Sequence, residues 1–190
     1  MRLEKLVGDI QNEMYQKIAE NNTMEKEEAE KTAKQVALSA IKYGDLSNQA
    51  SKDYIFDIDR FTSFEGDTGP YILYTIVRIK SILAKYQEQG KSLENLCLEE
   101  ARGASEKDLM RQLCSFNAMM DSACEETAPH KICAYIYDLA NAFNKFYHET
   151  KILAEEDQKK QAGWIALLKL TKEVLETCID VLGFSAPDRM

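Results

Sequence analysis

Few residues in this chain could carry out catalysis, and their spacing forms no known catalytic arrangement. The only histidines are His130 and His148, so catalysis built on a histidine acid, base or nucleophile has little to work with. Glu126 precedes His130 by four residues and no Glu-x-x-His pair occurs, which argues against a di-iron helical bundle. Neither a Gly-x-x-x-x-Gly-Lys nor a Gly-x-Gly-x-x-Gly phosphate-binding motif is present. We therefore expect no catalytic residue, no metal site and no cofactor site in this chain.

A second group of residues has the spacing of a binding surface. Tyr71, Tyr74 and Arg78 stand at positions i, i+3 and i+7, so on a helix they lie on one stripe, offset from the apolar face. Tyrosine rings can stack on bases and arginine can bind phosphate, so this stripe suits a nucleic-acid backbone or a stacked base better than a protein core. Lys80 and Lys85 could add phosphate contacts, although single surface lysines usually serve only solubility.

The composition is that of an ordinary globular protein. Of the 190 residues, 45% are hydrophobic and 29% are charged, and only three prolines and eight glycines interrupt the chain, which favours long helices. No run of about 18 apolar residues could span a membrane, and charges throughout the N-terminal segment argue against a secretory signal. The formal net charge of −8 gives no support to a nucleic-acid ligand, but net charge does not decide what a local patch binds.

The cysteines argue for a reducing environment. Five cysteines, an odd number, are widely spaced and include no Cys-x-x-Cys pair, so neither a disulfide framework nor a zinc site is expected. Free cysteine is among the most often buried residue types. We therefore predict that these residues are core thiols of a cytoplasmic protein.

The apolar residues recur at helical spacing along most of the chain. Helices are expected over residues 3–18, 25–43, 70–88, 105–124, 129–147 and 155–182. Asn21-Asn22-Thr23 separates the first two, Gly44 ends the second, and Gly183 caps the last. Pro70 and Pro129 suit first helical positions, and the segment Ser105 to Asp108 resembles a capping box. Residues 45–69 are expected to form loops around a short element. The predicted fold is an all-α bundle of about six helices.

Three segments resemble the arginyl-tRNA synthetases of class I. VALSAIKYGDLSNQASKDYIFDIDRF is similar to the family's Ala-Val-Lys-Tyr-Ala-Asp-Leu-Ser segment and the Asp-Tyr-x-Phe-Asp-x-Asp-Arg that follows it. SFEGDTGPYILYTIVRIKSIL resembles Phe-x-Gly-x-Thr-x-Pro-Tyr, then Tyr, then Arg-x-x-Ser-Ile. The stretch from DLANAFNKFYHETKIL to VLGFSAPDRM shares the family's Pro-x-Arg-Met ending. The three segments occur in the family's order and cover nearly the whole chain.

The resemblance implies a division of the chain and a function. Residues 1–70 resemble the helical tail that follows the catalytic core, and residues 71–190 resemble the anticodon-binding helical domain of a subgroup of class I synthetases. The family's His-Ile-Gly-His and Lys-Met-Ser-Lys-type motifs are absent, so we expect a C-terminal fragment that is inactive alone. The resemblance implies that the parent enzyme attaches arginine to its tRNA with ATP and magnesium and needs bound tRNA to activate arginine. The expected partners are arginine tRNA and the catalytic domain of the same polypeptide, and we expect a monomer.

The resemblance also implies roles for individual residues. Tyr147 matches the tyrosine of the family's Phe-Tyr motif, which lies against an anticodon base; the alternative is that Tyr147 is buried with Phe143 and Phe146. Met190 matches a terminal methionine that approaches the anticodon loop, and Arg189 could pair with its carboxylate or contact phosphate. The predicted RNA-binding residues are Tyr71, Tyr74, Arg78, Tyr147, Arg189 and Met190.

Two points remain open from the sequence. Trp164 stands where family members commonly carry an arginine; we expect it to pack inside the protein, with stacking on a base as the alternative. The chain could also be a helical protein–protein interaction module or a stand-alone, synthetase-derived regulator. The Asp-Arg-Met ending and the glycine-rich loop before Pro70 favour tRNA binding over an unrelated interaction module.

Overall fold

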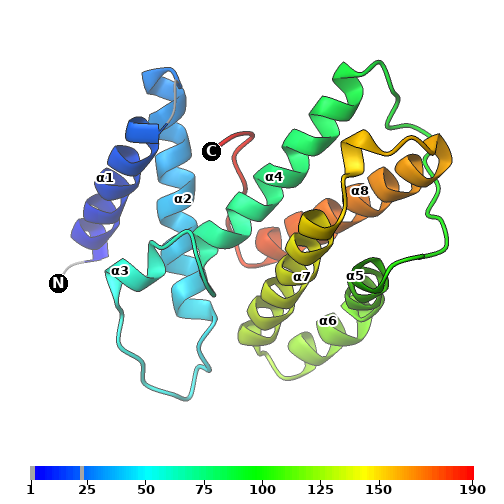
Figure 1. Cartoon of the computed structure of the whole chain (residues 1–190). Coiled ribbons are helices and arrows are strands. Elements are labelled where there is room, and N and C mark those ends of the chain that lie inside the picture. The colour runs from blue at the N-terminus through cyan, green and yellow to red at the C-terminus, as the bar shows by residue number, and fades with distance from the viewer. Residues whose placement is uncertain (1–2, 22–23) are drawn as a thin grey trace.

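The computed structural model describes residues 3–21 and 24–190, and every regular element within them is helical (Figure 1). The elements are α1 (Leu3–Asn21), α2 (Lys26–Leu46), α3 (Ile58–Phe61), α4 (Gly69–Glu88), α5 (Ala104–Cys114), α6 (Phe116–Glu125), α7 (Pro129–Glu149), the 3-10 turn η1 (Ile152–Ala154) and α8 (Gln158–Val181). The all-α prediction is confirmed. The expected break at Asn21-Asn22-Thr23 falls mainly on residues 22 and 23, which lie outside the described residues. None of the described helices is long and apolar enough to cross a membrane.

The helices form two groups that α4 connects. α1 and α2 pack side by side at one end, and α5 to α8 form the group at the other end (Figure 1). α4 contacts α2 in the first group and both α7 and α8 in the second. The chain that follows α8, residues 183–190, returns toward α2, and we call this segment the tail. One continuous cluster of buried side chains extends from α1 through α4 to the tail.

Three helix boundaries lie where the sequence signals predicted them: the starts of α4 and α7 and the end of α8. The Thr68 hydroxyl accepts a hydrogen bond from the backbone N–H of Tyr71 at 3.2 Å, so Thr68 caps α4 and Pro70 lies in its first turn. Pro129 is the first residue of α7. Gly183 follows α8 with a φ of +81°, the left-handed conformation that glycine adopts most easily.

Gly44 does not end α2, contrary to the prediction. The helix continues to Leu46, and Gly44 faces α3. A Cβ at this position would lie 2.9 Å from the Phe61 ring, so the glycine allows close packing between α2 and α3. The sequence shows the missing side chain but not the neighbour that requires it.

The helix predicted over 105–124 is two helices, α5 and α6, which meet at Ser115. The Ser115 hydroxyl donates to the carbonyl of Gln112 at 2.7 Å, a local bond that competes with helix continuation. The cap of α5 also differs from the predicted capping box. The Glu106 carboxylate accepts from the backbone N–H groups of Arg102 at 3.0 Å and Gly103 at 3.4 Å, so the helix begins one residue earlier than expected.

The prediction that the cysteines are core thiols is correct for Cys133 and Cys178 and wrong for the rest. Burial raises the pKa of both thiols to about 12. The exposed cysteines are Cys97, Cys114 and Cys124. The first lies in the segment between α4 and α5, and the other two lie near the ends of α5 and α6, where only one helix face packs against α7.

Candidate nucleic-acid interface

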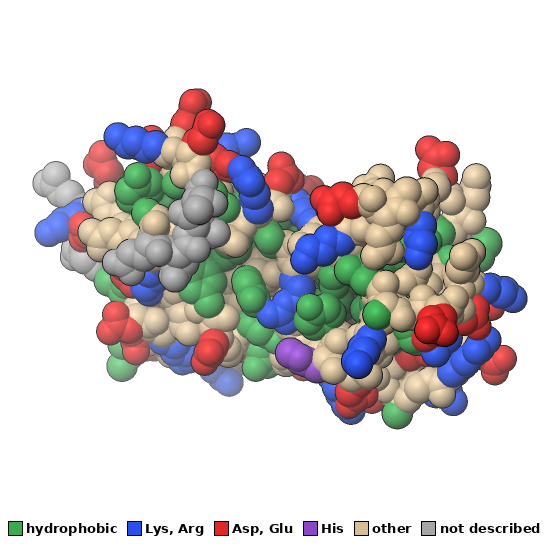
Figure 2. Space-filling view, turned by 45° about the horizontal axis from the view of Figure 1, so that its top comes forward, with side chains coloured by type: hydrophobic (Ala, Val, Ile, Leu, Met, Phe, Trp, Pro, Cys, Tyr) green, Lys and Arg blue, Asp and Glu red, His purple; other side chains and the backbone are tan. Residues whose placement is uncertain are grey.

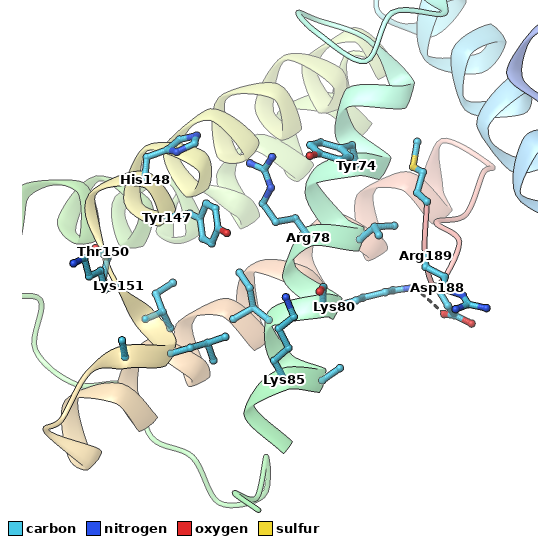
Figure 3. A pocket seen from close by; sticks show the side chains of 18 residues that line it. Tyr74, Arg78, Lys80, Lys85, Tyr147, His148, Thr150, Lys151, Asp188 and Arg189 are labelled. Carbon is cyan, nitrogen blue, oxygen red and sulfur yellow. Dashed lines mark hydrogen bonds and ion pairs between the residues drawn. The ribbon is translucent and has the colours of Figure 1, made fainter. Parts of the chain in front are cut away.

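A cleft of about 910 Å³ lies between α4, the end of α7, the turn η1 and the tail (Figure 3). Five of the six predicted RNA-binding residues line it, namely Tyr74, Arg78, Tyr147, Arg189 and Met190. They come from three segments that are far apart in the sequence, so packing of α4 against α7 and return of the tail are both needed to assemble the cleft.

The centre of the cleft is an arginine between two tyrosine rings. The guanidinium carbon of Arg78 lies 4.6 Å from the centroid of the Tyr74 ring and 5.3 Å from that of Tyr147 (Figure 3). Its Nη1 donates a hydrogen bond of 2.6 Å to Oδ1 of Asn144. The attraction between the cation and the two rings, together with this bond, orders the guanidinium beside the tyrosines of α4 and α7.

Tyr147 belongs to the edge of the core and to the surface at once. Its ring stacks against the buried ring of Phe143, with centroids 6.0 Å apart and an interplanar angle of 25°. The residue nevertheless remains 36% exposed and borders the cleft, unlike the fully buried Phe143 and Phe146. The alternative that Tyr147 is an ordinary core residue therefore accounts for only one side of its ring.

Tyr71 lies outside the cleft lining and joins α4 to α7. Its hydroxyl donates to Oδ1 of Asn141 and accepts from Nδ2 of Asn144, both at 2.8 Å. Burial is the main cause that raises the pKa of this phenol. Because Asn144 binds both Tyr71 and Arg78, it orients the arginine. Asn144 was not among the predicted residues, although it precedes Tyr147 by three residues and so shares its side of α7.

The remaining lining combines apolar side chains with basic ones. Val77, Ile82, Ile152 and Leu153 contribute apolar surface, and Lys85, Lys151 and His148 lie among the polar residues. Within the described part of the chain, Asp188 is the only acidic residue of the lining. Figure 2 shows Lys and Arg side chains near the middle of one face, mixed with exposed hydrophobic groups; further basic side chains lie among the acidic ones toward both ends. Lys151 was not predicted, because it follows α7 in a segment without helical periodicity.

Lys80 and Arg189 border the cleft but bind other protein groups. The Lys80 ammonium donates to the carbonyl of Pro187 at 3.1 Å and to Asp188 at 3.2 Å, which ties the tail to α4. Arg189 binds both carboxylate oxygens of Glu28 on α2, at 2.7 and 2.6 Å. This pairing differs from the predicted one with the Met190 carboxylate. The Met190 side chain itself is partly buried against the core.

Trp164 packs inside the protein, as expected. It is only 8% exposed, and its Nε1 donates to Glu106 at 3.1 Å. Its ring meets that of Phe146 edge to face, with centroids 5.9 Å apart. Trp164 therefore holds α8 against α5 and α7 and offers no free face to a base.

These features define an all-helical module whose cleft presents exposed tyrosine rings beside basic groups. The family described as DALR anticodon binding domain matches residues 72–190, and the family described as tRNA synthetases class I (R), catalytic domain, matches residues 1–58. The first match covers more than half of the chain. The chain therefore belongs to the DALR anticodon-binding domain family.

Similar proteins are arginine–tRNA ligases. The one from Agathobacter rectalis is 64% identical over the whole of this chain and 33% of its own length, and the one from Alkaliphilus oremlandii is 48% identical over the whole chain and 32% of its length. The chain thus spans about a third of these relatives. The solved arginyl-tRNA synthetase of Thermus thermophilus superimposes with a TM-score of 0.89 at 26% identity, over 100% of this chain and 32% of that one. The Plasmodium falciparum enzyme, at 24% identity and a TM-score of 0.85 over 100% of this chain and 34% of that one, shows the same fold.

Proposed function

We propose that this chain binds the anticodon loop of arginine tRNA in the cleft between α4, α7 and the tail. The observation that carries the proposal is the array of Tyr74, Arg78 and Tyr147, in which two partly exposed rings flank one guanidinium. Anticodon loops are recognised as single strands, whose splayed bases stack on aromatic side chains and arginine planes. The family match and the relatives named above support the choice of tRNA as the ligand.

The basic residues of the cleft suit the phosphates between such bases. Among the described residues, Lys85 and Lys151 form no ion pair, so their ammonium groups can neutralise phosphate without first breaking a contact inside the protein. Arg78 keeps donors in addition to the one that binds Asn144. Phosphate contacts would set the position of the strand, and the tyrosines would hold its bases. The overall net charge of −8 does not oppose this, because the basic groups converge on one cleft.

The proposal extends to the whole enzyme. We propose that residues 71–190 are the anticodon-binding domain. Residues 1–70 would then be the helical segment that follows the catalytic core, and the catalytic half attaches arginine to the tRNA. Within residues 3–21 and 24–190, no group of three or more His, Cys, Asp or Glu side chains is placed to hold a metal ion. We further propose that the whole enzyme uses ATP and magnesium, bound by parts outside this chain. We also propose that the enzyme is a cytoplasmic monomer.

The test is to replace Tyr147 with alanine and to measure the affinity of the chain for an arginine-tRNA transcript by fluorescence anisotropy. Losing one base stacked on an aromatic ring costs about 1–3 kcal/mol, so we expect binding to weaken about 5- to 150-fold. Tyr147→Phe should retain most of the affinity, because the ring remains. Tyr54→Ala is the matched control: Tyr54 is 39% exposed, close to Tyr147, but lies in the segment between α2 and α3, away from the cleft.

The thermal unfolding midpoint of each variant separates binding from folding. We expect Tyr147→Ala to lower affinity at a temperature where the protein is fully folded. Equal affinities for the Tyr147→Ala and Tyr54→Ala proteins would refute the assignment of this cleft. Wild-type protein that binds arginine tRNA no better than an unrelated RNA of equal length would refute the function and favour a protein-interaction module.

A further inference from the structure

α2 contacts the tail through residues spaced seven apart, although it contributes nothing to the lining of the cleft. Glu28, Gln35 and Lys42 lie on one side of α2, since seven residues make nearly two helical turns. We call these residues the α2 row. Its contacts, in order along the helix, are Glu28 with Arg189, Gln35 with Ser185 and Lys42 with Gly183. The tail therefore runs antiparallel to α2.

The three contacts differ in kind. Glu28 accepts two hydrogen bonds from the Arg189 guanidinium, and this pairing is the main cause that holds the pKa of Glu28 below its usual value. Gln35 Nε2 donates to the Ser185 hydroxyl at 3.1 Å, and Lys42 Nζ donates to the Gly183 carbonyl at 2.6 Å. The lysine ammonium thus lies at the C-terminal end of α8, where the helix dipole favours a cation. It also occupies the space that a Cβ at Gly183 would take.

The tail forms part of the cleft wall beyond these contacts. Asp188, Arg189 and Met190 all line the cleft, and Lys80 of α4 binds the tail from the other side at Pro187 and Asp188. The end of the tail is thus held between α2 and α4. α2 lies within residues 1–58, the part that matches the class I catalytic domain, whereas the tail and most of α4 belong to the anticodon-binding match.

We propose that Glu28, Gln35 and Lys42 are positioning residues for RNA binding, which hold the tail so that its last residues complete the cleft. This inference rests on the proposed function of the cleft and adds a role for a helix that does not contact the RNA. Because linkage is reciprocal, RNA bound against the tail also stabilises the contact between the tail and α2. Occupancy of the cleft is thereby coupled to the position of the helix pair that belongs with the catalytic part.

The size of the effect follows from how often the tail occupies its place. A single exposed ion pair contributes little by itself, so removal of one contact loosens the tail without unfolding the protein. If reversing the charge of Glu28 leaves the tail in place about a fifth of the time, the apparent Kd for RNA rises about fivefold, because affinity scales with the binding-competent fraction.

The experiment compares Glu28→Arg with Glu27→Arg in the full chain. Glu27 is exposed and adjacent to Glu28 in the first turn of α2, so its reversal makes the same change in net charge and in the helix dipole without touching the tail. Two quantities are measured: hydrogen–deuterium exchange at the Gly183 and Phe184 amides of the tail, whose N–H groups donate to the carbonyls of Asp180 and Ile179, and affinity for the arginine-tRNA transcript. Glu28→Arg should speed exchange of the tail and raise Kd about fivefold. Glu27→Arg should change neither in that direction.

A charge swap tests whether the pair itself is responsible. The double variant Glu28→Arg with Arg189→Glu should restore slow exchange of the tail. Its affinity is not compared, because Arg189 itself lines the cleft. Exchange that stays fast in the double variant would overturn the proposal, since the pair of Glu28 and Arg189 would then not hold the tail. Faster exchange in Glu28→Arg with unchanged affinity would also overturn it. Failure of the proposed function is a distinct result: in that case wild-type protein lacks specific affinity, or Tyr147→Ala leaves it unchanged.

Discussion

Replacing Gly69 with alanine tests the close contact between α2 and α4. α2 holds the tail and α4 carries the aromatic side of the cleft, so this contact fixes the position of one relative to the other. Gly69 is the first residue of α4 and lies against the backbone of α2 at Ser39. An added Cβ would lie nearest the Ser39 carbonyl oxygen, 2.5 Å from the carbonyl carbon and 3.0 Å from the Cβ of Tyr43. Ordinary contact begins at 3.4 Å, so the two backbones would have to separate by about 1 Å.

This separation of α2 and α4 would disturb a region that is fully packed. Tyr43 is buried beside this contact, and its hydroxyl lies 2.5 Å from Asp67 Oδ1 and 2.9 Å from the Cys133 carbonyl of α7, so a shift of α4 also disturbs these hydrogen bonds. Overpacking of this kind costs about 1–3 kcal/mol. For a chain of 190 residues we expect the thermal midpoint to fall by about 2–12 °C.

Thermal unfolding followed by far-UV circular dichroism at 222 nm measures the effect, with Gly8→Ala as the control. Gly8 lies within α1, and a Cβ there would meet no heavy atom within 4 Å. Alanine is favoured over glycine inside a helix by about 0.5–1 kcal/mol, so the control should be slightly stabilised. If Gly69→Ala were as stable as wild type, the close approach of α2 and α4 would not limit the packing and the reasoning would be wrong.

Three further predictions concern charge and accessibility. Arg78→Ala should weaken tRNA binding. The logarithm of the association constant should also fall less steeply with log salt, by about one unit of slope, as expected for one lost phosphate contact; an unchanged slope would exclude that contact. In a thiol titration at pH 8 with a disulfide reagent, Cys133 and Cys178 should react slowly because burial raises their pKa to about 12, and the other three cysteines should react fast; five fast thiols would contradict the packing. Arg189 lowers the pKa of Glu28, so this carboxylate stabilises the tail at neutral pH and loses its effect only as the pH falls below its usual pKa of about 4.3. Exchange of the tail, corrected for intrinsic rates, should depend less on pH in Glu28→Gln than in wild type, because the Asp188 carboxylate still binds Lys80.

The helices could be predicted because their signals are local. Pro70, Pro129 and Gly183 act through their own backbone geometry, and the apolar period is a property of neighbouring residues. The predictions were wrong where a residue distant in the sequence determines the local structure. Gly44 looked like a helix end because glycine often terminates helices, yet its role is contact with Phe61, which follows it by 17 residues.

The candidate site divides in the same way. The family motifs and the spacing of aromatic and basic residues identified Tyr74, Arg78 and Tyr147, because residue type and helical position are visible in a sequence. Asn144 and Lys151 were not predicted. Asn144 is a partner of Arg78 and Lys151 lies beside η1, and both positions depend on how α4 packs against α7.

By itself, the sequence determined that this protein is a set of amphipathic helices with an anticodon-binding signature, because helical periodicity, caps and short motifs are encoded within a few residues of one another. Only the tertiary structure decided which of the predicted residues share one cleft, that Trp164 is buried, and that Arg189 binds Glu28 of α2 instead of a neighbouring carboxylate. These outcomes depend on contacts between residues as much as 161 positions apart, and such contacts leave no periodic trace in the chain.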